Sequence, residues 1–180
     1  MKKYIKHLMI ISKHKLYVMK FCFKCGIYKR GLLHDLSKFG PTEFLNSAKY
    51  YTGTRSPIDI EKEEKGYSLA WLHHRGKNPH HWEYWIDNLG SYENKPCKIP
   101  KEYIVEMLCD WISAGIVYSN KKPDYNKPYK EPLDYYKKGR GFYIFEKNTQ
   151  DVVELMLAII ADNGINEFCK YAKLFIKYGE

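Results

Sequence analysis

The sequence predicts an all-α fold, a single-domain helical bundle over residues 1–180. Apolar side chains recur at the three- and four-residue spacing of an amphipathic helix along most of the chain. Segments with the two-residue alternation of a strand are scarce, and no internal repeat is visible. A length of 180 residues is typical of one domain and allows a substantial buried core.

Glycine and proline delimit the predicted helices of the N-terminal half. Gly26 suits the end of the first helix, and Gly40-Pro41 separates the second from the third, because proline favours the first helical turn. An acidic first turn complements the dipole of the fourth helix, and Asn78-Pro79 ends that helix. We therefore expect helices over residues 2–27, 32–38, 42–51, 60–74 and 79–87.

The C-terminal half contains a long apolar helix and a closing helix pair. An irregular segment, residues 88–100, precedes the long helix, and a polar, proline-rich segment, residues 119–130, follows it. Asn163-Gly164 is a strong helix stop between the last two helices. We expect helices over residues 101–118, 133–138, 148–162 and 165–178, with residues 130–180 forming an addition to a core domain.

The chain is basic, with a formal net charge of +9 and a pI near 9.1. This charge favours phosphorylated small molecules, nucleic acid or anionic lipid as partners and does not choose among them. Lys and Arg are dispersed, with the densest stretch at residues 121–130, so we interpret most of them as a solvated surface. No stretch approaches the ~20 apolar residues of a membrane span, which predicts a protein outside the membrane.

Cysteine usage predicts a reduced, cytoplasmic protein. The five cysteines are an odd number, and the apolar run from Leu8 to Ile11 is too short for the core of a secretory signal. Cys22 and Cys25 form a CxxC pair within an apolar helix, and no second pair completes a zinc site. We therefore interpret both as core residues and not as a metal or redox site.

An adjacent histidine and aspartate, His34-Asp35, lie within the sequence LLHDLSK, which ends at Lys38. Leucines surround the pair, and an unpaired charge in such a setting is unfavourable, so the pair predicts a buried cation with ligands from several helices. Neighbouring residues on a helix point about 100° apart, and only a short or terminal helical turn presents both to one site. The two oxygens of Asp35 make it the candidate that bridges two cations.

Two other residues are candidate ligands on physical grounds. Asp110 lies in an apolar helical run, where an aspartate is exposed unless it is paired or bound to a metal. The alternative is one polar face of an amphipathic helix, which Glu106 would share from one turn earlier. His14 lies on the first predicted helix, just before the His-Asp pair, and could otherwise be an ordinary surface or core histidine.

Four of the seven histidines fall within nine residues, as two doublets. Large aromatic residues surround them, which predicts a partly buried wall of a site, although exposure by coincidence remains an alternative. We expect one member of each doublet to bind metal, with His74 and His80 preferred. His73 and His81 then serve as catalytic or substrate contacts.

The order of these residues resembles the HD-domain superfamily of metal-dependent phosphohydrolases. In that superfamily a helical bundle supplies a first His, a His-Asp doublet and a later Asp to one metal, and some members add two histidines and a second metal. The resemblance covers residues 10–115 and maps the ligands onto His14, His34, Asp35 and Asp110. It also implies a phosphate contact at Lys38, to which Arg75 and Lys77 add positive charge.

The resemblance implies hydrolysis of a nucleotide or related phosphate ester by metal-activated water, with a histidine of the cluster as acid. Mixed histidine and carboxylate ligands suit Mn, Fe, Co, Ni or Zn, as one or two ions. Two alternatives remain. One is a di-iron oxygenase of the HD type, which needs both metal sites. The other is a non-catalytic basic helical module that binds nucleic acid or protein and has no stoichiometric metal.

Overall fold

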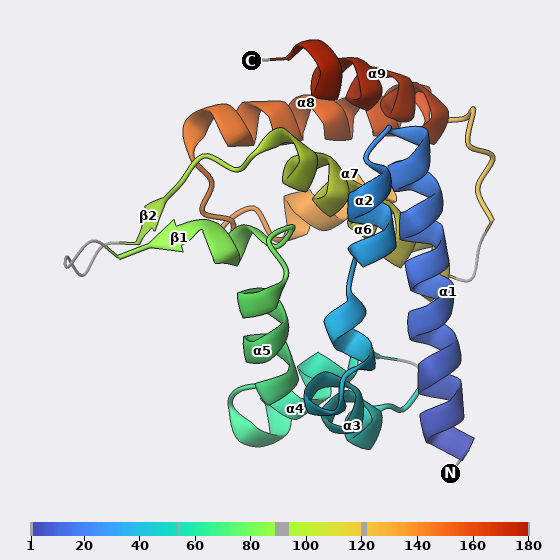
Figure 1. Ribbon diagram of the computed structural model, residues 1–180, viewed down its shortest axis with the longest axis vertical. Helices are drawn as coiled ribbons and strands as arrows, with labels where there is room; N and C mark the ends of the chain where they lie inside the picture. The colour runs from blue at the N-terminus through green and yellow to red at the C-terminus, as the bar shows by residue number, and fades with distance from the viewer. Residues whose placement is uncertain (1, 54, 89–93, 120–121, 180) are drawn as a thin grey trace.

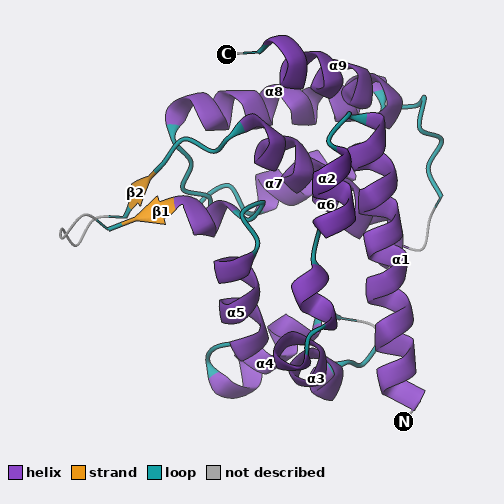
Figure 2. Ribbon diagram, viewed as in Figure 1, coloured by secondary structure: helices purple, strands orange, loops and turns teal. Residues whose placement is uncertain are grey.

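The computed structural model describes residues 2–53, 55–88, 94–119 and 122–179 and confirms the all-α prediction. Figures 1 and 2 show helices in every part of the molecule and one short hairpin at its edge. The elements are α1 (Lys2–Lys24), α2 (Tyr28–Leu33), η1 (Leu36–Phe39), α3 (Pro41–Tyr50), α4 (Pro57–Lys65), α5 (Leu69–Lys77), η2 (Trp82–Trp85), β1 (Ile86–Asp87), β2 (Lys95–Pro96), α6 (Lys101–Ser119), α7 (Glu131–Lys138), α8 (Lys147–Asn163) and α9 (Ile165–Tyr178), where η denotes a 3-10 helix.

The central core lies where α1 and α6 pack against the C-terminal helix pair. In Figure 1 α8 and α9 lie across the end of the molecule opposite α3 and α4, and α1 runs along one side. The fully buried side chains include Phe21 of α1, Ile112 of α6, Leu157 of α8 and Phe168 of α9. Each such side chain contributes about 1.5–3 kcal/mol through removal of apolar surface from water. The C-terminal helices therefore share the core of α1 and α6.

The predicted helix over residues 32–38 is wrong in one respect that matters for the site. The structure ends α2 at Leu33 and begins η1 at Leu36, so the chain is not helical at His34 and Asp35. Asp35 has a φ of +53°, in the left-handed region, and is the one non-glycine residue with a positive φ among those described. Such strain is costly and is commonly found at functional sites.

The predicted helix over residues 60–74 is two helices, α4 and α5. Gly66 ends α4 with a φ of +80°, which glycine adopts without a steric penalty. Ser68 then caps α5, because its hydroxyl accepts a hydrogen bond from the backbone N–H of Trp71. The break turns α5 so that it packs against α3 and places His74 beside Asp35.

The predicted first helix, residues 2–27, ends earlier, at Lys24, and α2 begins at Tyr28, four residues before the predicted second helix. The remaining predicted helices agree with the structure within two residues, except around residues 79–100. Only η2 is helical between residues 79 and 87, and β1 pairs with β2 in an antiparallel hairpin that the sequence did not indicate. Part of the segment predicted as irregular, residues 89–93, lies outside the described residues. The closing helices agree within one residue at each end, since Gly164 ends α8 where predicted.

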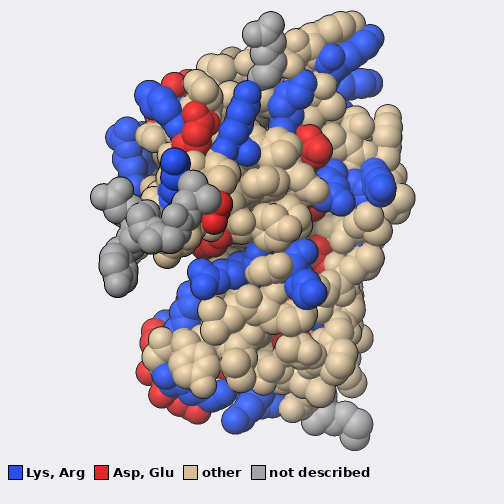
Figure 3. Space-filling model, turned by 60° about the vertical axis from the view of Figure 1, so that its left-hand side comes forward, with Lys and Arg blue, Asp and Glu red and all other residues tan. Residues whose placement is uncertain are grey.

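Cysteines and surface charge follow the sequence-based interpretation. Cys22 and Cys25 are fully buried in the core, beside Cys109 and Cys169. In Figure 3 the Lys and Arg side chains are spread over the visible face and mixed with acidic ones, without one continuous basic patch. Among the described residues, no helix combines the length and the apolar character of a membrane span.

Candidate metal centre

The break between α2 and η1 aims both members of the His-Asp pair into one interior site. His34 and Asp35 are each 1% exposed. The left-handed conformation of Asp35 turns the chain between them, so their side chains converge although they are adjacent in sequence. The distance from His34 Nε2 to Asp35 Oδ2 is 3.2 Å. The pair thus lies directly after the end of a helix, where two adjacent side chains can reach the same site.

The first group of side chains surrounds Oδ2 of Asp35. His14 comes from α1, His34 and Asp35 from the break, and Asp110 from α6. His14 Nε2 lies 4.0 Å from Asp35 Oδ2 and 2.8 Å from Asp110 Oδ1, and His34 Nε2 lies 3.8 Å from Asp110 Oδ1. All four residues that the sequence predicts as one metal's ligands therefore converge.

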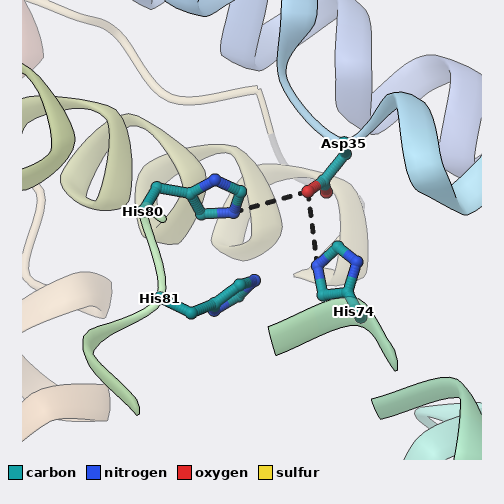
Figure 4. A group of neighbouring side chains, drawn as sticks. All are labelled: Asp35, His74, His80 and His81. Carbon is teal, nitrogen blue, oxygen red and sulfur yellow. Dashed lines mark ion pairs between the residues drawn. The ribbon is translucent and has the colours of Figure 1, made fainter. Parts of the chain in front are cut away.

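The second group surrounds Oδ1, the other oxygen of Asp35. Figure 4 shows His74 of α5 and His80, from the turn before η2, pointing at this oxygen, with His81 beside them. His74 Nε2 lies 3.3 Å from Asp35 Oδ1, and His80 Nε2 lies 3.4 Å from it. Asp35 thus presents one oxygen to each group, as expected of a bridging carboxylate.

Each of these two groups could hold a metal ion. Within each group the candidate ligand atoms lie within 4.8 Å of one another, and the residues are buried except for the partly buried His81 and Asp110. The atoms without a hydrogen bond in the described part of the chain include Nε2 of His74, His80 and His81 and Oδ1 of Asp35. Such an atom costs about 1–3 kcal/mol when buried without a partner. A bound cation would remove that penalty by accepting these lone pairs.

Glu106 contacts one histidine of each group, at the ring nitrogen that faces away from Asp35. Its Oε1 lies 2.9 Å from Nδ1 of His34 and 3.4 Å from Nδ1 of His80. The Nδ1–H of His34 donates to this carboxylate, which turns Nε2 toward Asp35, where it can bind a cation once it has lost its proton. The Arg30 guanidinium lies 3.8 Å from the other oxygen of Glu106. Glu106 also forms a third group of possible ligands with these two histidines, but its contacts are with the nitrogens that face away from Asp35.

Glu43 of α3 performs the same task for the second group alone. Its two oxygens lie 2.7 Å from Nδ1 of His74 and 2.7 Å from Nδ1 of His73. His74 is therefore oriented with Nε2 toward Asp35, while His73 points to the outer side of the same carboxylate. Glu43 is not predicted from the sequence, and Glu106 is expected there only as part of a polar helix face.

Burial and charge set the protonation of the centre. Burial lowers the pKa of His14, His74 and His81, which favours the neutral imidazole that binds metal. Burial also disfavours the charged form of His34, but Asp35, Glu106 and Asp110 outweigh it and raise the pKa of His34 to about 10.

The two carboxylates of the centre are ionised. Burial would raise the pKa of Asp35 and of Asp110, yet the neighbouring histidines hold both pKa values well below the usual range. For Lys38, burial is outweighed by Asp35 and Asp110, which raise the pKa of its ammonium group. Its Nζ lies 2.6 Å from Asp35 Oδ2, so a cation from the chain sits at the bridging carboxylate.

The remaining predicted site residues divide into two sets. Lys38 and His81 border a cavity that opens onto the centre. His73 belongs to none of the groups of possible ligands found among the described residues, and it does not line the cavity. Arg75 and Lys77 on α5 also lie outside the lining of that cavity. The structure therefore brings His81 to the ligand group and leaves His73 as a neighbour of Glu43.

Comparisons with known proteins establish the family and not an activity. No curated protein and no solved structure matches the chain. A profile of a protein family matches residues 3–159, which include every residue of both ligand groups and, apart from Lys2, all of α1 to α7. The chain belongs to this family, which is described as a family of unknown function, DUF5662.

Proposed function

We propose that this protein is a metal-dependent phosphohydrolase of the HD type, acting on a nucleotide or related phosphate ester. The observation that carries the proposal is the shared carboxylate: Asp35 turns one oxygen to His14, His34 and Asp110 and the other to three histidines. Two-metal sites that transfer phosphoryl groups use this kind of bridged arrangement. We further propose that the protein is cytoplasmic, which its free and mostly buried cysteines support.

Each ligand group would hold one divalent ion, and the mixed nitrogen and oxygen donors suit Mn, Fe, Co, Ni or Zn. Bound there, the ions would polarise a phosphoryl oxygen and lower the pKa of water toward neutrality. The side chains of the chain supply position and charge. Asp35 fixes the separation of the two ligand groups, and Glu106 keeps His34 and His80 turned toward it.

Lys38 is the proposed phosphate contact. Its ammonium group borders the cavity and approaches the bridging carboxylate, so an incoming phosphate would meet a positive charge beside the centre. His81 also borders the cavity, and we assign it to the second ligand group in place of the acid role considered from the sequence. His73, Arg75 and Lys77 take no part in the proposed reaction.

A second candidate function, a di-iron oxygenase, is favoured by the completeness of the second ligand group. That chemistry needs two ions, and three histidines with Asp35 provide the second set of donors. Iron absorption together with consumption of oxygen in the presence of an organic substrate would identify it. Phosphate release without oxygen consumption would identify the phosphohydrolase.

The experiment is a panel of nucleotides and other phosphate esters assayed with added Mn²⁺ or Co²⁺. We expect hydrolysis by the wild-type protein and its loss in Asp35→Ala, together with the bound metal. Lys38→Ala should reduce kcat/KM and leave the metal content unchanged. Glu61→Gln is the matched control, because Glu61 is an equally buried carboxylate that bonds Ser68 and Lys65 away from the centre. Full turnover in Asp35→Ala would refute the mechanism.

The non-catalytic alternative gives a different pattern in the same preparation. A basic module that binds nucleic acid would contain no stoichiometric metal, hydrolyse nothing in the panel, and bind nucleic acid with a steep dependence on salt. Retention of that binding in Asp35→Ala would support this alternative.

A further inference from the structure

A cavity of about 770 Å³ lies against the metal centre, and its size and lining limit which substrates can reach the metal ligands. His14, His74, His81 and Asp110 form part of its wall, so candidate ligands of both groups face it. The rest of the wall comes mainly from α1, α4, α5, η2, α6, α7 and the segment that follows α7. The volume is within the range of small-molecule sites.

Aromatic side chains dominate the wall beyond the centre. They come from four helical elements and from the segment after α7, and they stand on several sides of the cavity. Rings in such an arrangement bind a flat ring through stacking and edge contacts. The lining includes Trp71, Trp82, Trp111, Tyr118, Tyr135 and Tyr143.

Apart from the residues of the two ligand groups, the positive and negative side chains of the cavity wall are equal in number. Three ammonium groups line it, and three carboxylates that belong to neither ligand group line it as well. One ammonium, that of Lys62, lies over the Trp71 ring at 5.4 Å from its centroid. A chain of two or three phosphates needs a cluster of cations along its length. Of the three lysines in the described cavity wall, Lys38 is the one that contacts the bridging carboxylate, where one phosphate would bind.

Glu83 supplies an unused hydrogen-bond acceptor in this wall. It follows His81 by two residues, lines the cavity, and its Oε2 is buried with no hydrogen-bond partner in the described part of the chain. A buried acceptor in that state is unfavourable unless a ligand donates to it. An N–H or O–H group on the bound ring would satisfy it.

From this arrangement we propose that the cavity selects phosphate monoesters with a single phosphate group and a flat ring that carries a hydrogen-bond donor. The phosphate lies at the metal centre beside Lys38, the ring lies between the aromatic side chains, and the donor bonds Glu83. Polyphosphates and monoesters of open-chain alcohols are the disfavoured classes. This inference rests on the proposed phosphohydrolase function.

The test compares four ligands on the metal-loaded wild-type protein: AMP, ADP, ATP and glycerol 3-phosphate. Binding is followed by tryptophan fluorescence, since three tryptophans line the cavity, and hydrolysis is followed by phosphate release. We expect AMP to bind about tenfold more tightly than either ATP or glycerol 3-phosphate, because stacking and single-phosphate recognition act together. Equal or tighter binding of ATP, or of glycerol 3-phosphate, would overturn the inference.

Two variants test the wall directly. Tyr135→Ala removes a ring that lines the cavity and is 59% exposed, and Tyr178→Ala is its control on α9, at 68% exposed. We expect only Tyr135→Ala to weaken AMP binding, with glycerol 3-phosphate unchanged. Glu83→Gln should reduce the preference for AMP over purine riboside monophosphate, which lacks the amino group. An unchanged preference, or equal loss with both tyrosine variants, counts against the proposal.

The outcomes for the cavity and for the reaction are separable. If no phosphate ester is hydrolysed but AMP still binds in the expected order, the phosphohydrolase function fails and the cavity assignment stands as a ligand site. If monoesters are hydrolysed without regard to ring or phosphate number, the function stands and the substrate class fails.

Discussion

The two ligand groups differ in how the fold holds them. The first group sits on α1, on the break between α2 and η1, and on α6, and both long helices are anchored by apolar core side chains such as Phe21 and Ile112. The second group draws three histidines from α5 and the turn after it. On α5 the buried side chains are Ala70 and His74 alone.

This difference indicates that apolar packing fixes the first group and that hydrogen bonds fix the second. Within the described residues α5 has little apolar surface to hold it, and the carboxylates of Glu43 and Glu106 orient His74 and His80 in its place. The first group is thus preformed by the core. The second depends on polar contacts and on whatever cation it binds.

We expect the largest effect from variants that remove a ligand of one group, because each should lose the ion of that group and keep the other. Asp110→Asn removes a ligand of the first group and His80→Ala removes one of the second, so each should lower the metal content from about two ions per chain to about one. His73→Ala is the control, since His73 neighbours His74 but belongs to neither group. Elemental analysis checks the result. Loss of both ions in both variants would mean that the groups do not act separately.

A second effect concerns the rigidity of α5. A cation at 100 times its Kd adds about 2.7 kcal/mol to the stability of whatever it holds together. We expect chelation to increase amide hydrogen exchange in α5 and residues 78–85 far more than in α1 and α6. Uniform protection in both regions after chelation would contradict the contrast drawn between the two groups.

The outer carboxylates should affect the groups unequally. Glu106 bonds a histidine of each group, whereas Glu43 reaches the second group only. Loss of such a partner typically lowers metal affinity about 10–100-fold. Glu106→Gln should therefore weaken both ions, and Glu43→Gln only one, in a titration of the metal-free protein. Glu61→Gln should weaken neither, and identical isotherms for the Glu43 and Glu106 variants would refute the assignment.

The smallest effect is a proton released on metal binding. In the metal-free protein the pKa of His34 is raised to about 10, so His34 is protonated at pH 7.5 and must lose that proton before Nε2 can bind a cation. Burial lowers the pKa values of His74 and His81, so these two ligands of the second group have no proton to release. Calorimetry in buffers of different ionisation enthalpy measures the release. Proton release that is as large in a variant without His34 as in the wild type would contradict this assignment.

The sequence predicts the first group and only part of the second, for physical reasons. A lone Asp110 in an apolar run needs a partner, and the adjacency of His34 and Asp35 requires a helix end, so both features are local. Which histidine of a doublet faces inward depends on how α5 packs against α3, and that follows from the break at Gly66. The sequence gives preference to His74 and His80 and does not place His81 in the ligand group.

The outer carboxylates could not be predicted, because a buried and an exposed glutamate look alike in a sequence. Glu43 stands in the first turn of α3, where a solvated acidic residue is common, and Glu106 is spaced like one polar face with Asp110. Their burial, 2% and 3% exposed, arises only when α3 and α6 meet the histidines. One signal in the sequence could have indicated them. Each histidine that binds metal through one ring nitrogen needs a hydrogen-bond acceptor for the other nitrogen, so several buried histidines imply nearby carboxylates.

The central claim is that one carboxylate bridges two cation sites, and metal content tests it most directly. Elemental analysis of the purified protein, saturated with Mn²⁺ or Co²⁺ and then dialysed, should give about two ions per chain in the wild type and none in Asp35→Ala, with α-helical circular dichroism unchanged. A wild-type protein that retains no ion, or an Asp35→Ala variant that retains both, would contradict the account.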